Sequence, residues 1–201
     1  MKRFLRLGVA AVALVGALVL NATGAQAEVT WDAVVKKLKS AKDYTVKYEY
    51  EGPKGKFEFD HRIVDPNGSP KVRTEILNSK SEPGKKGTVL VYDPAWNKDK
   101  VRAKIGGGAI TRNLTHKDVV DTPFYQGIFT IVMDQVAKCG KAAISKDGDK
   151  TVFRFKCGGG TYTVWANANA EIVRTERIAD KVKEVRQFSS ITWNSGPNVS
   201  F

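Results

Sequence analysis

The chain has 201 residues, with 33 Lys and Arg against 21 Asp and Glu, and it contains only two histidines and two cysteines. His61 and His116 lie in separate segments without a nearby pattern of carboxylates, which argues against a metal site. The sequence has no G-x-S-x-G, no phosphate-binding loop and no H-E-x-x-H. We therefore expect a protein that is not an enzyme and that needs no metal or cofactor.

The first 27 residues have the pattern of a signal peptide. Lys2, Arg3 and Arg6 precede an apolar run over residues 8–20, and a small-x-small motif at residues 25–27 is typical of a cleavage site. The apolar run is too short to span a membrane. We expect cleavage after Ala27, export to the periplasm, and a single mature domain over residues 28–201.

The predicted mature chain still has nine more Lys and Arg than Asp and Glu. Nucleic acid is a poor explanation for this charge in an exported protein. An anionic membrane surface or a membrane protein is a better candidate for the partner. A basic surface that only keeps the protein soluble explains the charge equally well.

The N-terminal part predicts one helix followed by three strands. Residues 28–42 have the apolar spacing of an amphipathic helix, which Thr30 can cap. Strands with alternating apolar residues follow at 44–51, 56–64 and 71–77. His61 lies on the apolar face of the second strand, so we expect it in a core or a cavity, whereas we expect His116 to be exposed.

The central part predicts two strands, at 88–92 and 100–105, and then two helix starts. Residues 115–118 have the spacing of a capping box. Thr122 precedes a proline, which favours a helix over 123–137. This helix is apolar on nearly its whole circumference. It is either a core helix or one that lines an apolar cavity.

The C-terminal part predicts five strands, at 141–145, 151–157, 160–166, 171–178 and 183–193. A turn at Gly148 would set Cys139 opposite or nearly opposite Cys157, so we expect a cross-strand disulfide in an oxidising compartment. The whole pattern indicates an α+β fold: about ten antiparallel strands with one apolar and one charged face, curled into an incomplete barrel around helices.

Several short motifs resemble the periplasmic lipoprotein carriers of the Lol type and their relatives. The run Gly87-Thr88-Val89-Leu90-Val91-Tyr92-Asp93-Pro94 resembles the family pattern DG-x-x-[FW]-x-Y-[DN]-P, and Asp121-Thr122-Pro123-Phe124 resembles its N-T-P-F helix start. Residues 148–153 and 170–173 resemble the hairpin and strand that follow. The resemblance implies an incomplete antiparallel barrel whose helices close over an apolar cavity that holds acyl chains.

We therefore predict a carrier or chaperone that binds a lipid, a lipoprotein or another apolar ligand, although the same residues can also fill a dry core. If the central helix closes the cavity, Ile128→Ala should weaken ligand binding more than it lowers stability. The predicted lining consists of the large apolar side chains of the strands and of the central helix: Tyr48, Tyr50, Phe57, Phe59, Val89, Val91, Phe124, Ile128 and Phe129.

A second interpretation also follows from the resemblance, because relatives of these carriers include envelope-stress sensors that bind a protein partner. The segment from Lys80 to Lys104 has seven Lys and Arg against three Asp and Glu. In that interpretation, this basic segment would be the docking face for the partner.

Overall fold

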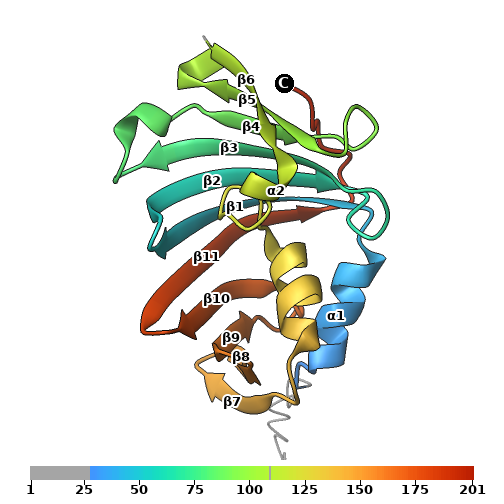
Figure 1. Cartoon of the computed structure of the whole chain (residues 1–201). Helices are drawn as coiled ribbons and strands as arrows, with labels where there is room; N and C mark the ends of the chain where they lie inside the picture. The colour runs from blue at the N-terminus through green and yellow to red at the C-terminus, as the bar shows by residue number, and fades with distance from the viewer. Residues whose placement is uncertain (1–27, 109) are drawn as a thin grey trace, which may run out of the picture.

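A computed structural model describes residues 28–108 and 110–201, so the predicted signal peptide lies outside the described residues. One antiparallel sheet of eleven strands runs in the order β6-β5-β4-β3-β2-β1-β11-β10-β9-β8-β7 and curls without closing (Figure 1). The predicted α+β half-barrel is confirmed. The strands are β1 Asp43–Gly52, β2 Gly55–Val64, β3 Lys71–Ser79, β4 Val89–Tyr92, β5 Lys100–Ile105, β6 Ile110–Thr115, β7 Ala143–Asp147, β8 Lys150–Cys157, β9 Gly160–Ala166, β10 Ile172–Ala179 and β11 Val182–Trp193.

The curl has a concave apolar face because the side chains of its strands alternate between the two sides. In β1, Tyr44, Val46, Tyr48 and Tyr50 are buried, and the residues between them point to the other side. Tyr48 is opposite Phe59 in β2 and Phe188 in β11, so the buried set continues across the middle of the sheet.

Two helical segments lie side by side inside the lower half of the curl (Figure 1). The first, α1, spans Trp31–Ser40, and the Thr30 side chain accepts a hydrogen bond from the Ala33 amide at 3.2 Å, as predicted. Its Trp31 ring packs against Phe153 and Phe155 of β8. No helix in the described part of the chain is long and apolar enough to cross a membrane.

The second segment is shorter than the helix predicted over residues 123–137. Residues 121–127 form turns, and helical backbone starts only at Ile128. It continues as the π-helical η3, Thr130–Gln135, and the 3₁₀-helical η4, Val136–Lys138. The prediction failed at Gly127, a poor helix former that lies against the sheet. A Cβ at Gly127 would clash with His61 Nε2, so the backbone makes a close contact that a residue with a side chain does not permit there.

The other predicted helix start, at residues 115–118, is also different in the structure. It is the single turn α2, His116–Val119, and Thr115 makes no capping hydrogen bond with its side chain. Two further 3₁₀ turns, η1 at Pro83–Lys85 and η2 at Gly106–Gly108, lie in loops. The eleventh strand, β6, was not predicted, because it is exposed along nearly its whole length and has no pattern of burial.

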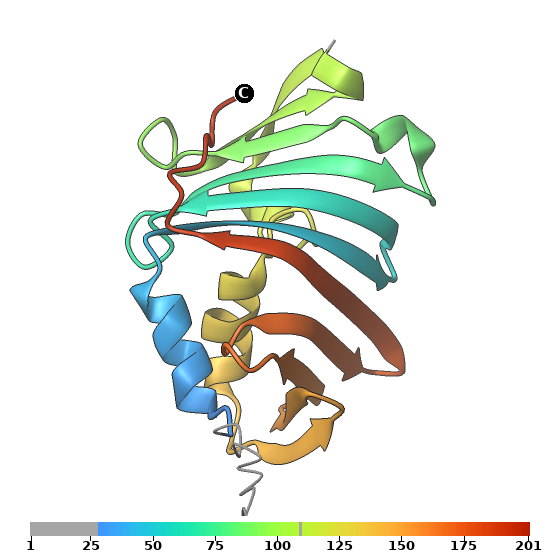
Figure 2. The ribbon, with the colours of Figure 1, turned by 180° about the vertical axis from the view of Figure 1, so that it is seen from behind.

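The C-terminal residues 194–201 form no strand or helix and lie against the convex side of the sheet. Figure 2 shows this segment running from the end of β11 toward β5. The Arg73 guanidinium donates to the Ser200 carbonyl at 3.2 Å, and the Phe201 ring lies between Arg102 and Lys104. The convex face is therefore partly covered by the chain's own end.

Cys139 and Cys157 form the predicted disulfide, but it does not join two strands. Cys157 ends β8, whereas Cys139 directly follows η4 and lies four residues before β7. The prediction assumed a strand that reaches back to residue 141, and β7 begins only at Ala143. The disulfide therefore fastens the end of the helical segment to the lower part of the sheet.

We predict that replacing both cysteines by serine lowers the free energy of unfolding by roughly 3 kcal/mol, because the bond closes a loop with a sequence separation of 18 residues. Urea denaturation of the mature protein measures this loss. Reductant should destabilise the wild type by a similar amount and leave the double variant unchanged. An equal unfolding free energy for the two proteins would show that the disulfide does not constrain the unfolded chain.

Candidate ligand-binding site

An apolar cavity of about 290 Å³ lies on the concave face of the upper half of the sheet. Strands β3 to β6 form its floor. Its cover consists of α2 and of the first residues of the irregular stretch 121–127, which we call the covering segment. The lining consists mainly of aliphatic side chains, with one lysine and one aspartate: Ile76, Lys85, Thr88, Leu90, Ala103, Ile105, Leu114, Asp118, Val119, Thr122 and Phe124.

One end of the apolar cavity is an aromatic wall. The Phe124 ring meets Phe57 and Phe59 edge to face, with centroids 5.3 and 5.6 Å apart. The Lys85 ammonium lies 5.5 Å from the Phe124 centroid and 5.8 Å from that of Phe57. A cation over two aromatic faces is favourable. The Lys85 ammonium also pairs with the Glu82 carboxylate at 2.7 Å, so both contacts hold it at the cavity.

A second pocket, of about 270 Å³, lies on the other side of the same covering segment and is polar. The covering segment separates the two cavities, since Thr122 and Phe124 line the apolar one whereas Asp121, Pro123 and Gln126 line the polar one. The full lining of the polar pocket is Lys54, Asp121, Pro123, Gln126, Gln135, Tyr162, Arg177, Glu184 and Arg186.

The covering segment is held from below by two tyrosine hydroxyls of β1. Tyr48 donates to the Pro123 carbonyl at 2.6 Å, and the Phe129 amide donates to the Tyr44 hydroxyl at 3.3 Å. Burial raises the pKa of both phenols, so both stay protonated at physiological pH. Irregular backbone needs such partners when it is buried.

His61 lies below the same segment and is 1% exposed. Its Nδ1 is 2.9 Å from the Thr74 hydroxyl, and its Nε2 lies against Gly127 with no hydrogen-bond partner among the described residues. Burial lowers the pKa of His61 from 6.5 to about 4, and the Asp60 carboxylate opposes this only in part. The ring is therefore neutral at physiological pH, as expected for a core residue.

His116 is not fully exposed, contrary to the prediction. Its ring stacks on Tyr92 with centroids 4.2 Å apart and meets Tyr125 edge to face. Burial lowers the pKa of His116 as well. No local pattern indicated this contact, because Tyr92 is 24 positions away at the end of β4, whereas His116 begins α2.

The structure brings together five of the nine side chains predicted to line a cavity. Tyr48, Tyr50, Phe57 and Phe59 are buried on the concave face, and Phe124 lines the apolar cavity beside two of them. Ile128 is fully buried and is not among the lining residues, and Phe129 is only partly buried.

Val89 and Val91 are on the convex side. The register pairs His61 with Thr74, Thr74 with Leu90 and Leu90 with Ala103, so it is Leu90 that points into the curl. Val91 instead lies in a groove near Arg102 and the C-terminal segment. The run Val89-Leu90-Val91 is apolar on both sides, so its own pattern does not predict which side faces the concave interior. The neighbouring strand β5 does predict it, because Ala103 and Ile105 alternate with charged residues and Leu90 pairs with Ala103.

No protein-family model matches the sequence, and no curated protein matches it. Among solved structures, the chain is similar to the lipoprotein LppX from Mycobacterium tuberculosis, with a TM-score of 0.51 and 11% sequence identity over 84% of this chain and 95% of that one. It also matches a putative outer-membrane lipoprotein-sorting domain from Vibrio parahaemolyticus, with a TM-score of 0.42, 11% identity, and 82% and 92% of the two chains.

A third similar structure is the MucA/MucB complex from Pseudomonas aeruginosa, with a TM-score of 0.46 and 11% identity; the match covers 83% of this chain and 59% of the other. At these identities, the likeness to LppX shows a shared fold.

We predict that His61 makes the protein less stable in acid. The unfolded histidine takes up a proton near pH 6.5 and the folded one only near pH 4, so the unfolded state binds more protons between these values. The free energy of unfolding should fall by roughly 3 kcal/mol from pH 7 to pH 4 and then receive no further contribution from this group.

The measurement is urea denaturation across this pH range for the wild type and for His61→Gln. The variant should lose most of the slope between pH 6.5 and 4. His116→Gln is the matched control and should remove less, because His116 is less buried. Equal slopes for the wild type and His61→Gln would show that His61 is not buried neutral.

The position of Ile128 reverses the expectation drawn from the sequence. Ile128→Ala should lower the free energy of unfolding by about 2–5 kcal/mol, because its side chain is fully buried in the core. Binding of an apolar fluorescent probe to the folded fraction should be unchanged. A small stability loss with weaker probe binding would instead place Ile128 at the wall of the ligand cavity.

Proposed function

We propose that this protein is a non-catalytic carrier of the periplasm that holds an acyl chain, or another apolar group of similar shape, in the apolar cavity. The supporting observation is the aliphatic lining of the apolar cavity on the concave face. In a dry core, side chains would fill this space. Leu90, Ala103, Ile105 and Leu114 point toward a space that the covering segment leaves open.

The energetics favour such a ligand. Burial of apolar surface contributes roughly 25 cal/mol per Å², so a chain of methylene groups gains free energy in proportion to its length. The cavity volume of about 290 Å³ is at the lower end of the ~300–1,000 Å³ that ligand sites usually have. This size suits one alkyl chain better than a bulky lipid with several chains.

A second candidate function, binding of a protein partner, is favoured by the edge strand β6. Within the described residues, β6 pairs only with β5, and five of its six residues are exposed, including Ile110 at 50%. An open edge of this kind can accept a strand from another protein. Affinity capture from an envelope extract tests this candidate: a stable protein partner without co-purifying lipid would favour it over the carrier.

We predict that Leu114→Trp lowers the affinity for a neutral apolar probe, N-phenyl-1-naphthylamine, by at least about tenfold. The indole would occupy the volume that the probe needs, and Leu114 is only partly buried, so the edge strand can accommodate the change. Fluorescence titration of the purified protein measures the affinity, and circular dichroism checks the fold.

Thr111→Trp is the matched control, because it adds the same group to the same strand but on an exposed residue outside the cavity. It should leave the probe affinity within a factor of two of the wild type. If the wild type does not bind the probe, or if both variants bind it like the wild type, the apolar cavity is not a ligand site and the carrier function is wrong.

A further inference from the structure

The polar pocket contains an arginine with few close partners. Arg186 in β11 is 4% exposed. One terminal nitrogen donates to the Gln126 amide oxygen at 3.3 Å, the other lies 3.5 Å from the Glu184 carboxylate, and Nε has no partner among the described residues. A buried guanidinium with long and incomplete contacts has lost water without recovering equivalent hydrogen bonds.

Three arginines on the convex face, Arg62, Arg73 and Arg174, have closer carboxylate partners. Arg62 forms two hydrogen bonds with one carboxylate, at 2.8 and 3.2 Å to the oxygens of Asp60. Arg174 reaches Glu176 at 3.0 Å. In the polar pocket, by contrast, the Glu184 carboxylate is shared, because Arg177 lies 3.9 Å from its other oxygen. The single carboxylate of Glu184 therefore does not give Arg177 and Arg186 a close partner each.

The charges around the polar pocket leave it positive. Lys54, Arg177 and Arg186 face Asp121 and Glu184, an excess of one cation. The Arg186 guanidinium also lies over the Tyr50 ring, 5.1 Å from its centroid, which fixes the plane of its donors. At the buried Arg186 this excess is screened less than it would be in bulk water, whereas Lys54 and Asp121 are exposed to solvent.

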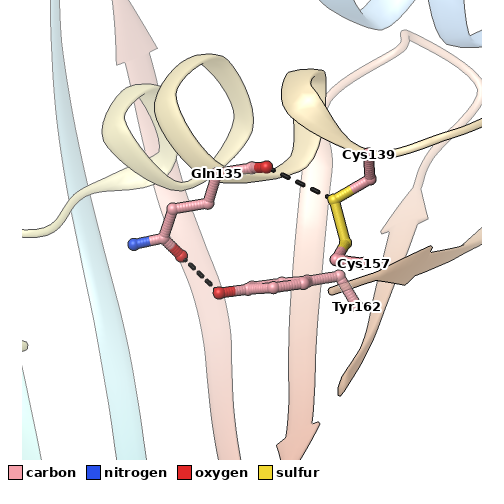
Figure 3. Close-up of a disulfide and its surroundings, with 4 residues drawn as sticks. All are labelled: Gln135, Cys139, Cys157 and Tyr162. Atoms are coloured by element: carbon pink, nitrogen blue, oxygen red, sulfur yellow. Dashed lines mark hydrogen bonds between the residues drawn. A yellow bond between two sulfur atoms is a disulfide. The ribbon is translucent and has the colours of Figure 1, made fainter. Parts of the chain in front are cut away.

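Gln135 and Tyr162, which also line the polar pocket, lie close to the disulfide (Figure 3). Tyr162 in β9 donates to the Gln135 side-chain oxygen at 2.7 Å, and the Gln135 carbonyl oxygen lies 3.3 Å from the Cys139 sulfur. The bond between Cys139 and Cys157 holds the end of η4 against the end of β8, close to the contact between Gln135 and Tyr162. This side of the pocket is therefore cross-linked to the sheet.

We infer that the polar pocket binds the anionic group, a phosphate or carboxylate, of an amphipathic ligand whose chain occupies the apolar cavity. This inference rests on the proposed carrier function. Guanidinium donors match the oxygens of phosphate and carboxylate, and such an anion would supply the missing partner of the buried Arg186 and would pair with the partly exposed Arg177. Residues 121–127 line both cavities, with Thr122 and Phe124 at the apolar one and Pro123 and Gln126 at the polar one, so a ligand that crosses this segment can present its chain to one cavity and its anionic group to the other.

Three probes test this inference by isothermal titration calorimetry with the full mature chain: dodecyl phosphate below its micelle concentration, dodecanol and inorganic phosphate. The wild type should bind dodecyl phosphate about 10- to 100-fold more tightly than dodecanol, the range expected for hydrogen bonds to a charged group. Arg177→Gln should reduce this preference to about threefold or less and leave dodecanol binding unchanged.

Arg174→Gln is the matched control, since it removes the same charge from the same strand on the opposite, convex face. It should keep the preference of the wild type. Arg186→Gln should behave like Arg177→Gln, and because Arg186 is buried, its fold is first checked by circular dichroism. Arg177, with a side chain 43% exposed, is the primary variant because it tolerates replacement.

The outcomes separate this inference from the proposed function. Equal preference for dodecyl phosphate in the wild type and Arg177→Gln, with dodecanol bound by both, would overturn the anionic site and leave the carrier function standing. If the wild type does not bind dodecanol, the carrier function is wrong. If inorganic phosphate alone then bound in an Arg177-dependent way, the pocket would be a site for a free anion rather than a headgroup.

Discussion

The arrangement depends on a stretch of irregular backbone, residues 121–127, most of which is buried inside the curl of the sheet. Its buried polar groups must find partners there, because water does not reach them. Tyr48 supplies a donor to the Pro123 carbonyl, and the Tyr44 hydroxyl accepts from the Phe129 amide. Gly127 completes the contact by allowing the backbone to approach His61. Without these three contacts neither cavity would have a cover.

The segments inside the curl pack fully against one half of the sheet and leave space over the other half. In the lower half, α1 and η3 place Val34, Leu38, Ile131 and Val132 on the sheet, and all four are 2% exposed or less. That half forms a packed core. In the upper half the chain offers only α2 and the covering segment, which are too short to fill the curl over β3–β6. Space therefore remains beside Leu90 and Ala103, and the cavity follows from the length of the elements.

The sequence predicted the features that local patterning decides. The alternation in β1 and β2 is regular, so the faces of Tyr48, Tyr50, Phe57 and Phe59 followed directly. Features that depend on distant contacts could not be predicted. The helix start moved to Ile128 because of a close approach to His61, which is 67 positions away, and the face of β4 was ambiguous because it is apolar on both sides. Nothing local marked β6 as a strand either.

The arginines were the least predictable part of the site, since an arginine in an alternating strand normally indicates the solvent side. On the convex face this holds: Arg62, Arg73 and Arg174 each pair with a carboxylate two residues away in the same strand. Such pairs contribute little to stability but keep the charges solvated.

Arg186 has the same spacing from Glu184, yet it points into the curl, in phase with Tyr50 across β1 and β11. A carboxylate two residues away was therefore not enough to distinguish a solvated pair from a buried one. The register with β1 decides the face. It places on the apolar side a charge that hydrophobic burial alone would exclude, and a protein that needed only a core would have a leucine or valine at this position.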